Sequence, residues 1–313
     1  MSSEAAPLVS ALVCTYNGGE YLRASIGSLL AQTHESLEVI VVDDGSTDGS
    51  VDPIEAENDP RVQVLRQENA GKSVAMNYGL SVAKGEFYFL HDADDLSYPR
   101  RVERQLARLQ EKPELAGVFC GYDLVVGERQ LAPRFRPKTV AECADDIEGL
   151  RMPGHDPTIM FRRALVDDFE YCPELRVGQG FDHILRVGEK HPLEVLGECL
   201  YSYRVHPESN TRKDPSRRER FVQMVRARAF ERRGIESEAA TTPQRVSKDR
   251  ADNGLAAHFM ESVTDLRGDG RRWEAIRTGL YCSKLGLLDF HYQKAFLCAV
   301  LPKSILAKLR GTN

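Results

Sequence analysis

The sequence predicts an α/β fold in which a mostly parallel central sheet is flanked by helices and followed by a helical C-terminal extension. Over roughly the first 110 residues, short apolar runs that suit buried strands alternate with segments of helical periodicity. Polar and acidic clusters follow several of these runs, as they do where ligands bind at the carboxyl edge of a parallel sheet. Alternating units of this length favour right-handed crossovers that cover the sheet with helices.

The expected elements follow in chain order. The expected strands are the apolar runs 8–15, 37–42, 62–65 and 86–91. The expected helices are 20–32, 72–83 and one that opens at Pro99. Between them, Gly45-Ser-Thr-Asp-Gly indicates a turn and a helix start. The stretch from about Gly117 to Arg204 mixes short strands with loops, and we expect it to face the substrate.

The last third of the chain has a different character. Residues 211–250 are rich in arginine, which favours a solvated helix and linker, with a patch for acidic lipid or phosphate as the alternative. Helices are expected around Trp273, Ile276 and Leu280. The apolar end, residues 295–309, is compatible with a helix on a membrane surface or with a packed terminal helix broken at Pro302.

Composition narrows the class of protein. The chain has 313 residues, 42% hydrophobic and 28% charged, which is ordinary for a soluble globular protein. Its formal net charge of -5 gives no indication of a nucleic-acid partner. Seven isolated cysteines argue against a disulfide framework or a zinc ribbon. With no signal peptide and no membrane-spanning run in the sequence, we expect a cytoplasmic protein, with peripheral contact at the inner face of the plasma membrane as an extension of that expectation.

Polar residues follow the first strand. The segment Thr15-Tyr16-Asn17-Gly-Gly-Glu20 lets backbone amides and a ring approach a ligand, and the next helix begins there with its positive dipole end. It does not match the glycine fingerprint of dinucleotide sites. A plain turn is the alternative.

Two acidic clusters follow later strands. Asp43 and Asp44 end the second strand, where one could cap a helix and the other accept from a base NH or a ribose hydroxyl. After the fourth strand, His91-Asp92-Ala93-Asp94-Asp95 places three carboxylates within four positions. Such crowding is unfavourable without a cation, and oxygen ligands suit Mg²⁺ or Mn²⁺ that share their shell with substrate phosphates. Helix capping ahead of Pro99 is the alternative.

These stretches carry a resemblance to a known family. The matching segments are 13–17 (VCTYN), 38–48 (EVIVVDDGSTD), 69–80 (NAGKSVAMNYGL), 83–86 (AKGE), 91–95 (HDADD), 158–163 (TIMFRR) and 203–209 (YRVHPES). Their order and spacing resemble the family 2 glycosyltransferases, which share the GT-A fold, over roughly residues 7–212. The resemblance implies a GT-A domain over 1–210, with a nucleotide-binding half at about 7–115 and an acceptor-side half at about 116–210. Residues 211–313 lie outside it.

The resemblance implies roles for individual residues. The implied nucleotide-sugar-binding residues are Thr15, Tyr16, Asn17, Glu20, Asp44, Lys72, Asn77, Asp92 and Ala93. Within this set, Asp44 would hold the base, and Lys72 and Asn77 would lie near the ribose or diphosphate. Asp94 and Asp92 would bind a divalent metal, Mn²⁺ or Mg²⁺, and His206 would complete the metal shell or close a loop over the diphosphate.

The catalytic base departs from the family pattern. The family often carries Glu-Asp, then an aromatic residue and Asp, ahead of a helix that ends in Leu-Arg, and the first Asp is the base. Aligned on Leu185 and Arg186, the base position of this chain falls on Gly180. Asp182 is the nearest carboxylate, and we expect it to act as the base. The alternatives are that another residue serves or that the chain is catalytically weak.

The resulting functional expectation is an inverting glycosyltransferase that uses a nucleotide-diphosphate sugar, with a UDP-sugar favoured. Its acceptor would be a glycan or a lipid-linked molecule in polysaccharide or cell-surface glycan synthesis. A catalytically weak nucleotide-sugar binding protein of the same fold is the first alternative, because Gly180 replaces the base. A sugar nucleotidyltransferase is the second.

Overall fold

The computed structural model describes most of the N-terminal part of the chain and a smaller share of the C-terminal part. The described residues are 6–126, 129–130, 136–205, 215–235, 259–260, 263–264, 266–267, 270–285 and 290–301. The chain forms two compact units, and each is described by itself. The first unit comprises Met1–Gly127, Pro133–Val205 and Arg218–Thr241, and the second comprises Glu128–Ala132, His206–Arg217 and Thr242–Asn313.

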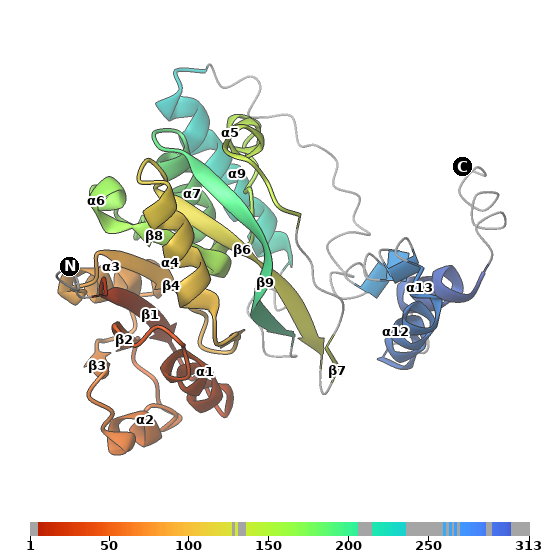
Figure 1. Cartoon of the computed structure of the whole chain (residues 1–313), viewed down its shortest axis with the longest axis horizontal. Coiled ribbons are helices and arrows are strands. Elements are labelled where there is room, and N and C mark those ends of the chain that lie inside the picture. The colour runs from red at the N-terminus through yellow and green to blue at the C-terminus, as the bar shows by residue number, and fades with distance from the viewer. Residues whose placement is uncertain are drawn as a thin grey trace. The chain divides into compact units, whose positions relative to one another are not determined.

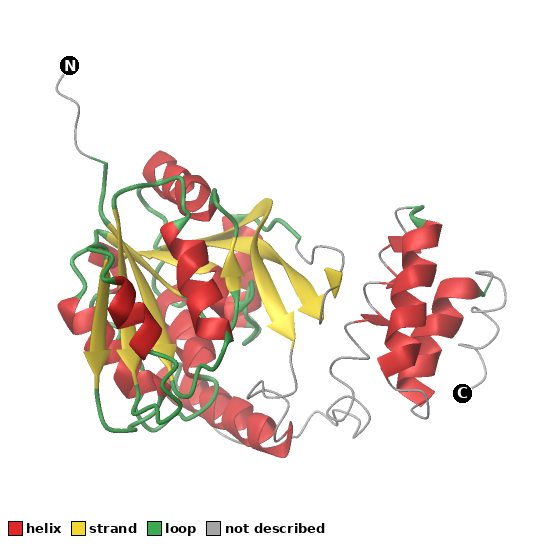
Figure 2. Cartoon of the chain, turned by 90° about the horizontal axis from the view of Figure 1, so that it is seen from below, coloured by secondary structure: helices red, strands yellow, loops and turns green. Residues whose placement is uncertain are grey.

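A central sheet organises the first unit (Figure 2). Its strand order is β3-β2-β1-β4-β8-β6-β9-β5. Its strands are β1 (Val9–Thr15), β2 (Leu37–Asp43), β3 (Val62–Arg66), β4 (Phe87–Leu90), β5 (Leu96–Ser97), β6 (Gly117–Val126), β8 (Ile159–Arg162) and β9 (Leu193–Val205); β7 (Arg129–Gln130) is a further short strand. Strand β1 pairs in parallel with β2 and β4, and β2 pairs in parallel with β3. Strand β6 is parallel to β9, whereas β8 is antiparallel to β4 and β6. The predicted mostly parallel sheet is therefore confirmed.

Helices cover both faces of this sheet (Figures 1 and 2). They are α1 (Tyr21–Leu30), α2 (Asp52–Glu57), α3 (Lys72–Val82), α4 (Arg101–Glu111), α5 (Val140–Glu148), the 3₁₀ turn η1 (Asp156–Thr158), α6 (Arg163–Val166), α7 (Gln179–Gly188) and α9 (Pro215–Arg232). Helix α1 shows why the periodicity was informative, because it buries Leu22, Ile26 and Leu29 at helical spacing. The expected strands and helices of the first 110 residues appear within a few residues of their predicted bounds.

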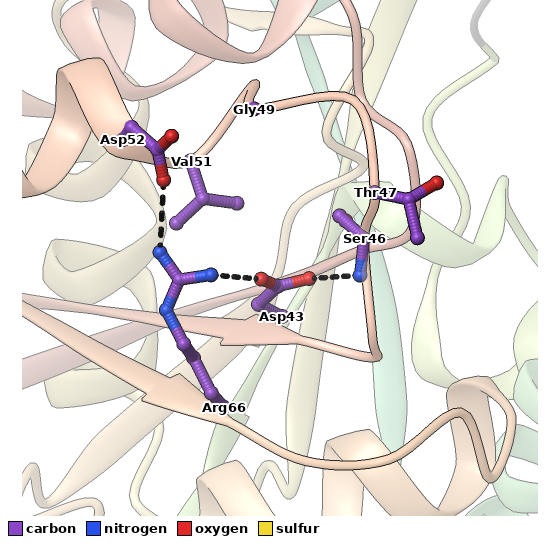
Figure 3. Close-up of a pocket in the computed structure, with 7 residues that line it drawn as sticks. All are labelled: Asp43, Ser46, Thr47, Gly49, Val51, Asp52 and Arg66. Carbon is purple, nitrogen blue, oxygen red and sulfur yellow. Dashed lines mark hydrogen bonds and ion pairs between the residues drawn. The ribbon is translucent and has the colours of Figure 1, made fainter.

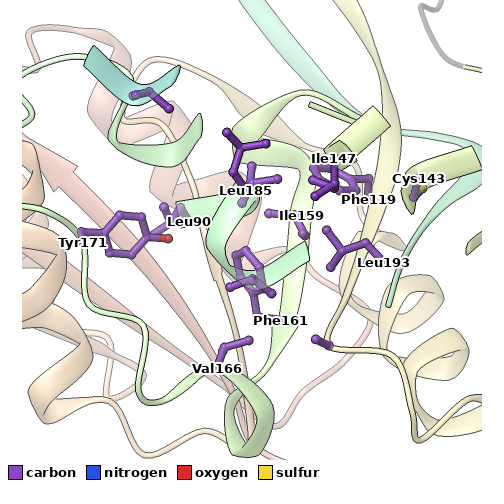
Figure 4. Close-up of a cluster of buried hydrophobic side chains, with 14 of the residues drawn as sticks. Leu90, Phe119, Cys143, Ile147, Ile159, Phe161, Val166, Tyr171, Leu185 and Leu193 are labelled. Atoms are coloured by element: carbon purple, nitrogen blue, oxygen red, sulfur yellow. The ribbon is translucent and has the colours of Figure 1, made fainter. Parts of the chain in front are cut away.

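The core of the first unit includes residues of α9, a helix that lies beyond the predicted domain boundary at residue 210. A large apolar cluster joins strands β4, β6 and β8 to helices α5 and α7 (Figure 4). Val225 and Ala229 of α9 belong to the same cluster and are fully buried. Helix α9 lies beyond residue 210, yet it packs on the first unit and completes its core.

The described C-terminal residues of the second unit are mainly helical, as predicted. Its described helices are α12 (Arg272–Leu285) and α13 (Phe290–Val300). Their small core contains Ala275, Cys298 and Ala299, whereas Trp273 is 79% exposed. In the described part of the chain, no helix is long and apolar enough to cross a membrane. None of the seven cysteines forms a disulfide bond in this structure.

A buried histidine in the first unit gives the fold a predictable response to acid. His183 of α7 stacks on Tyr171 with ring centroids 4.1 Å apart, and its Nε2 lies 3.4 Å from the hydroxyl of Tyr88. Burial lowers the pKa of His183 to about 3, with a further contribution from the Arg186 charge. In the unfolded chain this histidine is protonated below about pH 6.5, whereas in the folded chain it stays neutral down to about pH 3. Stability must fall as the pH drops through this window.

We expect His183→Phe to remove the part of the pH dependence of stability that His183 causes, so that acid unfolding moves to lower pH. Phe keeps a ring against Tyr171 and carries no titrating group. Urea unfolding followed by circular dichroism between pH 4 and 7 measures the effect, and His191→Phe, at a partly exposed histidine, is the matched control. An identical pH dependence in wild type and His183→Phe would contradict the expectation.

Candidate active site

Three loops leave the same edge of the sheet. In the parallel register Thr15 at the end of β1 lies beside Asp43 at the end of β2, and Leu12 lies beside Leu90 of β4. The backbone continues this pairing past the strand ends, because Asp44 N donates to Thr15 O at 2.9 Å. The polar segments that follow β1, β2 and β4 are therefore neighbours at one edge, where open α/β sheets bind ligands.

Asn17 joins two of these loops. Its backbone N donates to Ser46 Oγ at 2.9 Å, and its side-chain Oδ1 accepts from Thr47 N at 2.8 Å. It adopts a left-handed backbone with φ of 52°, a conformation that Asn tolerates better than most residues. Asn17 thus fixes the shape of this edge through its hydrogen bonds. Asn17 and Glu20 are exposed, and Tyr16 is 55% exposed.

Asp43 and Asp44 divide two structural tasks. Asp43 closes the turn after β2, because its Oδ1 accepts from Ser46 N at 2.8 Å and its Oδ2 pairs with Arg66 at 2.9 Å. Asp44 accepts from the backbone N of Ala70 at 2.8 Å and of Gly71 at 2.9 Å. Asp44 therefore holds the loop between β3 and α3 against the end of β2. Neither carboxylate caps a helix, because α2 begins at Asp52 with Val51 as its N-cap and no side-chain cap hydrogen bond.

A pocket of about 300 Å³ lies beside this turn (Figure 3). Arg66 reaches into it and pairs with Asp43, Asp52 and Glu55. Arg66 is the one cation among the residues that line this pocket, and its guanidinium is already paired with carboxylates, so the pocket does not resemble a site built to receive an anionic ligand.

The acidic cluster after β4 has the chemistry of a hard-cation site. Asp92, Asp94 and Asp95 can bring carboxylate oxygens within 4.8 Å of one another. Asp95 is fully buried and committed, with Oδ2 accepting from the Tyr201 hydroxyl at 2.7 Å and Oδ1 from Arg204 N at 2.8 Å. Burial raises the pKa of Asp95 well above its usual value, and the charges of Asp92 and Asp94 add to the rise. Because both oxygens of Asp95 accept hydrogen bonds from β9, Asp92 and Asp94 are the better candidates in this cluster to ligate a hard cation.

Lys72, the first residue of α3, neutralises part of this cluster. Its Nζ donates to Asp92 Oδ1 at 2.5 Å. Burial alone would lower the pKa of Lys72, but the carboxylates of Asp92 and Asp156 raise it above its ordinary value. Burial also opposes the ionisation of Asp92, yet the Lys72 charge lowers the pKa of that carboxyl. Lys72 and Asp92 therefore form an ion pair. Lys72 directly follows Gly71, whose backbone N donates to Asp44.

The side-chain amide of Asn77 binds the backbone of Tyr171. Its Nδ2 donates to Tyr171 O, and its Oδ1 accepts from Tyr171 N, both at 2.8 Å. With both ends of its amide bound to one backbone unit, Asn77 ties α3 to the segment ahead of α7. Ala93 is partly buried against the apolar cluster under β1 and β2. His206 lies outside the described residues.

The structure does not bring Asp182 to the acidic cluster. Its side chain is fully buried between α7 and α9, where Oδ2 pairs with Arg186 at 2.8 Å. Oδ1 lies 3.4 Å from Arg232 and 3.6 Å from Arg228. Positions two apart on a helix face different sides, so a carboxylate at 182 cannot replace one at 180. This geometry argues against Asp182 as the base, because three guanidinium groups hold its carboxylate away from any acceptor.

Asp156 is a carboxylate near the site that the sequence patterns did not single out. It opens η1, directly ahead of β8, and it interacts electrostatically with Lys72 and Asp92. The sequence held one indication of it: Asp156 stands two residues before the stretch at Thr158 that resembles the family, directly ahead of a strand. Arg204 was also missed; its Nε donates to the carbonyl of Asp94, so it fixes the acidic loop from β9.

The fold and this acidic edge define a chain of the GT-A class, and the sequence comparison gives its family. The chain matches the family described as Glycosyl transferase family 2 over residues 10–169, and it belongs to that family. It is 38% identical over 138 residues to an uncharacterised glycosyltransferase of Rickettsia bellii, covering 43% of this chain and 20% of that protein. It is 41% identical over 121 residues to glycosyltransferase GlyG of Streptococcus pneumoniae, covering 37% of this chain and 40% of that protein. The matches thus span between a fifth and two fifths of these relatives.

Solved structures share the fold over nearly the whole chain. TarS of S. aureus, residues 1–349, superposes with a TM-score of 0.58 at 19% identity and covers 98% of this chain and 92% of that one. The mannosyltransferase PcManGT of Pyrobaculum calidifontis, solved with GDP-Man and Mn²⁺, gives a TM-score of 0.57 at 19% identity and covers 98% and 88%. These likenesses confirm the predicted GT-A fold.

Proposed function

We propose that this chain transfers a sugar from a nucleoside-diphosphate sugar to an acceptor hydroxyl, with inversion at the anomeric carbon. The observation that carries the proposal is the pair Asp92 and Asp94, which bring oxygens together beside Lys72 at the ligand-binding edge of the sheet. Membership of family 2 supports it. Two proteins of the same fold have been solved with nucleotide sugars, TarS with UDP-GlcNAc and PcManGT with GDP-Man and Mn²⁺.

The residues at this edge suit the parts of such a donor. Tyr16, Glu20 and Asp44 would border the nucleotide, and Lys72 would add a positive charge near the diphosphate. Asp94 and Asp92 would hold Mn²⁺ or Mg²⁺, a fit that rests on their oxygen atoms and mutual distance. A cation bound there neutralises the charge that the departing diphosphate gains.

Several finer expectations accompany the proposal. We favour a UDP-sugar as donor and a glycan or a lipid-linked molecule as acceptor, in polysaccharide or cell-surface glycan synthesis. A cytoplasmic location and peripheral membrane contact through the C-terminal region stay predictions. No nucleic-acid partner is expected, on the net charge of -5.

A donor panel tests the proposal. UDP-GlcNAc, UDP-glucose, UDP-galactose and GDP-mannose are each added with Mn²⁺ or with EDTA, and the melting temperature is recorded. We expect one donor to raise it by several degrees with Mn²⁺ only, because a ligand that binds the folded state stabilises it by mass action. The same donor should then release its nucleoside diphosphate when a glycan extract is supplied.

Other outcomes separate the alternatives. Release of pyrophosphate from a sugar phosphate and a nucleoside triphosphate would indicate a nucleotidyltransferase instead. Metal-dependent donor binding without transfer to any extract would indicate a binding protein. Either result would overturn the proposed transfer.

A further inference from the structure

The carboxylate of Asp156 occupies the space in which a side chain of residue 180 would begin. A Cβ atom placed on Gly180 would lie 1.8 Å from Asp156 Oδ2, 2.1 Å from its Cγ and 2.3 Å from its Oδ1. These distances are far inside van der Waals contact, so the two positions compete for one volume. The family resemblance assigns the catalytic base to position 180. A carboxylate is therefore present where a side chain of residue 180 would start, and it belongs to Asp156 of η1 rather than to a residue of α7.

Asp156 also has the surroundings that a base requires. It is partly buried, and among the residues that the structure describes none is recorded as donating a hydrogen bond to its carboxylate or pairing with it. It interacts electrostatically with Lys72 and Asp92, which indicates that its carboxylate lies near the acidic cluster. Asp182 differs on each point, since it is fully buried and held by three arginines.

The turn that carries Asp156 is held by buried polar groups. Arg101 Nη2 donates to Pro157 O at 2.7 Å, and Gln105 Nε2 donates to Thr158 O at 2.8 Å. Arg101 and Gln105 belong to α4 and are both fully buried. A reacting group held in this way keeps its geometry through the reaction.

The protonation behaviour of Asp156 agrees with the geometry. Burial raises the pKa of Asp156 to about 6, the Lys72 charge opposes the rise, and the Asp92 charge adds to it. A base works best when its pKa lies near the working pH, where it is ionised and still accepts a proton readily. An ordinary exposed Asp is a weaker base.

We propose that Asp156 is the general base of the transfer reaction, in place of the missing carboxylate at position 180. This inference rests on the proposed function. The acceptor hydroxyl gives its proton to a carboxylate oxygen of Asp156 while its oxygen forms the new bond to the anomeric carbon. The bond from that carbon to the diphosphate oxygen breaks, and the nucleoside diphosphate leaves with the electron pair. Protonated Asp156 then releases its proton to water.

Moving the carboxylate between the two positions tests the proposal. Asp156→Asn and Asp156→Ala are expected to lower kcat by about 10²-fold or more, the usual contribution of general-base catalysis. Donor binding should survive, measured as the melting shift with UDP and Mn²⁺. In Asp156→Ala/Gly180→Asp, the small Ala leaves room for the new side chain, and we expect at least a tenfold recovery of kcat over Asp156→Ala. The matched control, Asp156→Ala/Gly180→Asn, has the same shape without the charge and should show no recovery.

The outcomes distinguish this proposal from the proposed function. Near-normal kcat in Asp156→Asn, with wild-type transfer intact, would overturn the base assignment and leave the function standing. Equal activity of the Gly180→Asp and Gly180→Asn double variants would also overturn it. A larger loss of kcat in folded Asp182→Asn than in Asp156→Asn would return the assignment to Asp182. Wild-type protein that transfers no sugar from any donor would instead remove the function itself.

Discussion

Replacing Asp94 by Asn is expected to lower metal-dependent sugar transfer by roughly 10³-fold. A bound cation supplies several kcal/mol of stabilisation to developing charge, and each 1.4 kcal/mol corresponds to a factor of ten in rate. Asp94 belongs to the acidic cluster whose carboxylate oxygens lie within 4.8 Å of one another, and both oxygens of its neighbour Asp95 accept hydrogen bonds from β9. Nucleoside diphosphate release at saturating donor, measured over a Mn²⁺ series, gives the effect.

The control for this variant removes the same charge elsewhere. Asp145→Asn lies on the exposed side of α5 and should leave transfer unchanged. A melting temperature close to that of wild type would show that Asp94→Asn is folded. Near-normal turnover in folded Asp94→Asn, or an undiminished response to Mn²⁺, would remove Asp94 from the cation site.

Arg101→Met is expected to cost the fold about 3 kcal/mol, the largest single effect on stability that we predict. The guanidinium is fully buried and donates to Gln105 Oε1 at 3.0 Å, Ser97 Oγ at 3.0 Å and Pro157 O at 2.7 Å. It also lies over the Phe89 ring, 4.4 Å from the centroid. Met fills much of the same volume, but the buried acceptors lose their donor, at roughly 1–3 kcal/mol each before relaxation and relief of the buried charge.

Urea unfolding measures this loss, and Arg104→Met provides the comparison on the same helix. Arg104 is 42% exposed and pairs with Glu198, so its removal should cost less than about 1 kcal/mol. Because Arg101 also holds η1, the folded fraction of Arg101→Met should have a lower kcat than wild type, whereas Arg104→Met should not. Equal stability losses in the two variants would contradict the role given to Arg101.

The sheet was predictable because its strands are simple to recognise. Buried parallel strands such as β1 and β2 are continuous apolar runs, and α1 repeats its apolar residues at the spacing of a helix. Helix α9 was harder to place. Its sequence is dominated by arginines, and only the structure reveals that Val225 and Ala229 insert into the core while Arg228 and Arg232 reach Asp182.

The acidic cluster could be located from sequence, but the tasks of its members could not. Asp92, Asp94 and Asp95 are alike in the sequence. They differ in the structure because Lys72 pairs with Asp92, and because Tyr201 and Arg204 of β9, over 100 residues later, bind Asp95. For the same reason nearness in sequence made Asp182 the natural substitute for Gly180. The geometry of α7 directs the Asp182 carboxylate away from the position of a side chain at residue 180. In contrast, η1 places the carboxylate of Asp156, 24 residues upstream, at that position.

The close approach of Gly180 to Asp156 has an evolutionary consequence. Because the two positions share one volume, an acidic side chain at either place excludes its counterpart at the other. A lineage that moves the acid from one position to the other must therefore pass through an ancestor that is crowded or lacks the acid. The substitutions should consequently occur as linked pairs, and a survey that scores position 180 alone would count such chains among the inactive members of their family.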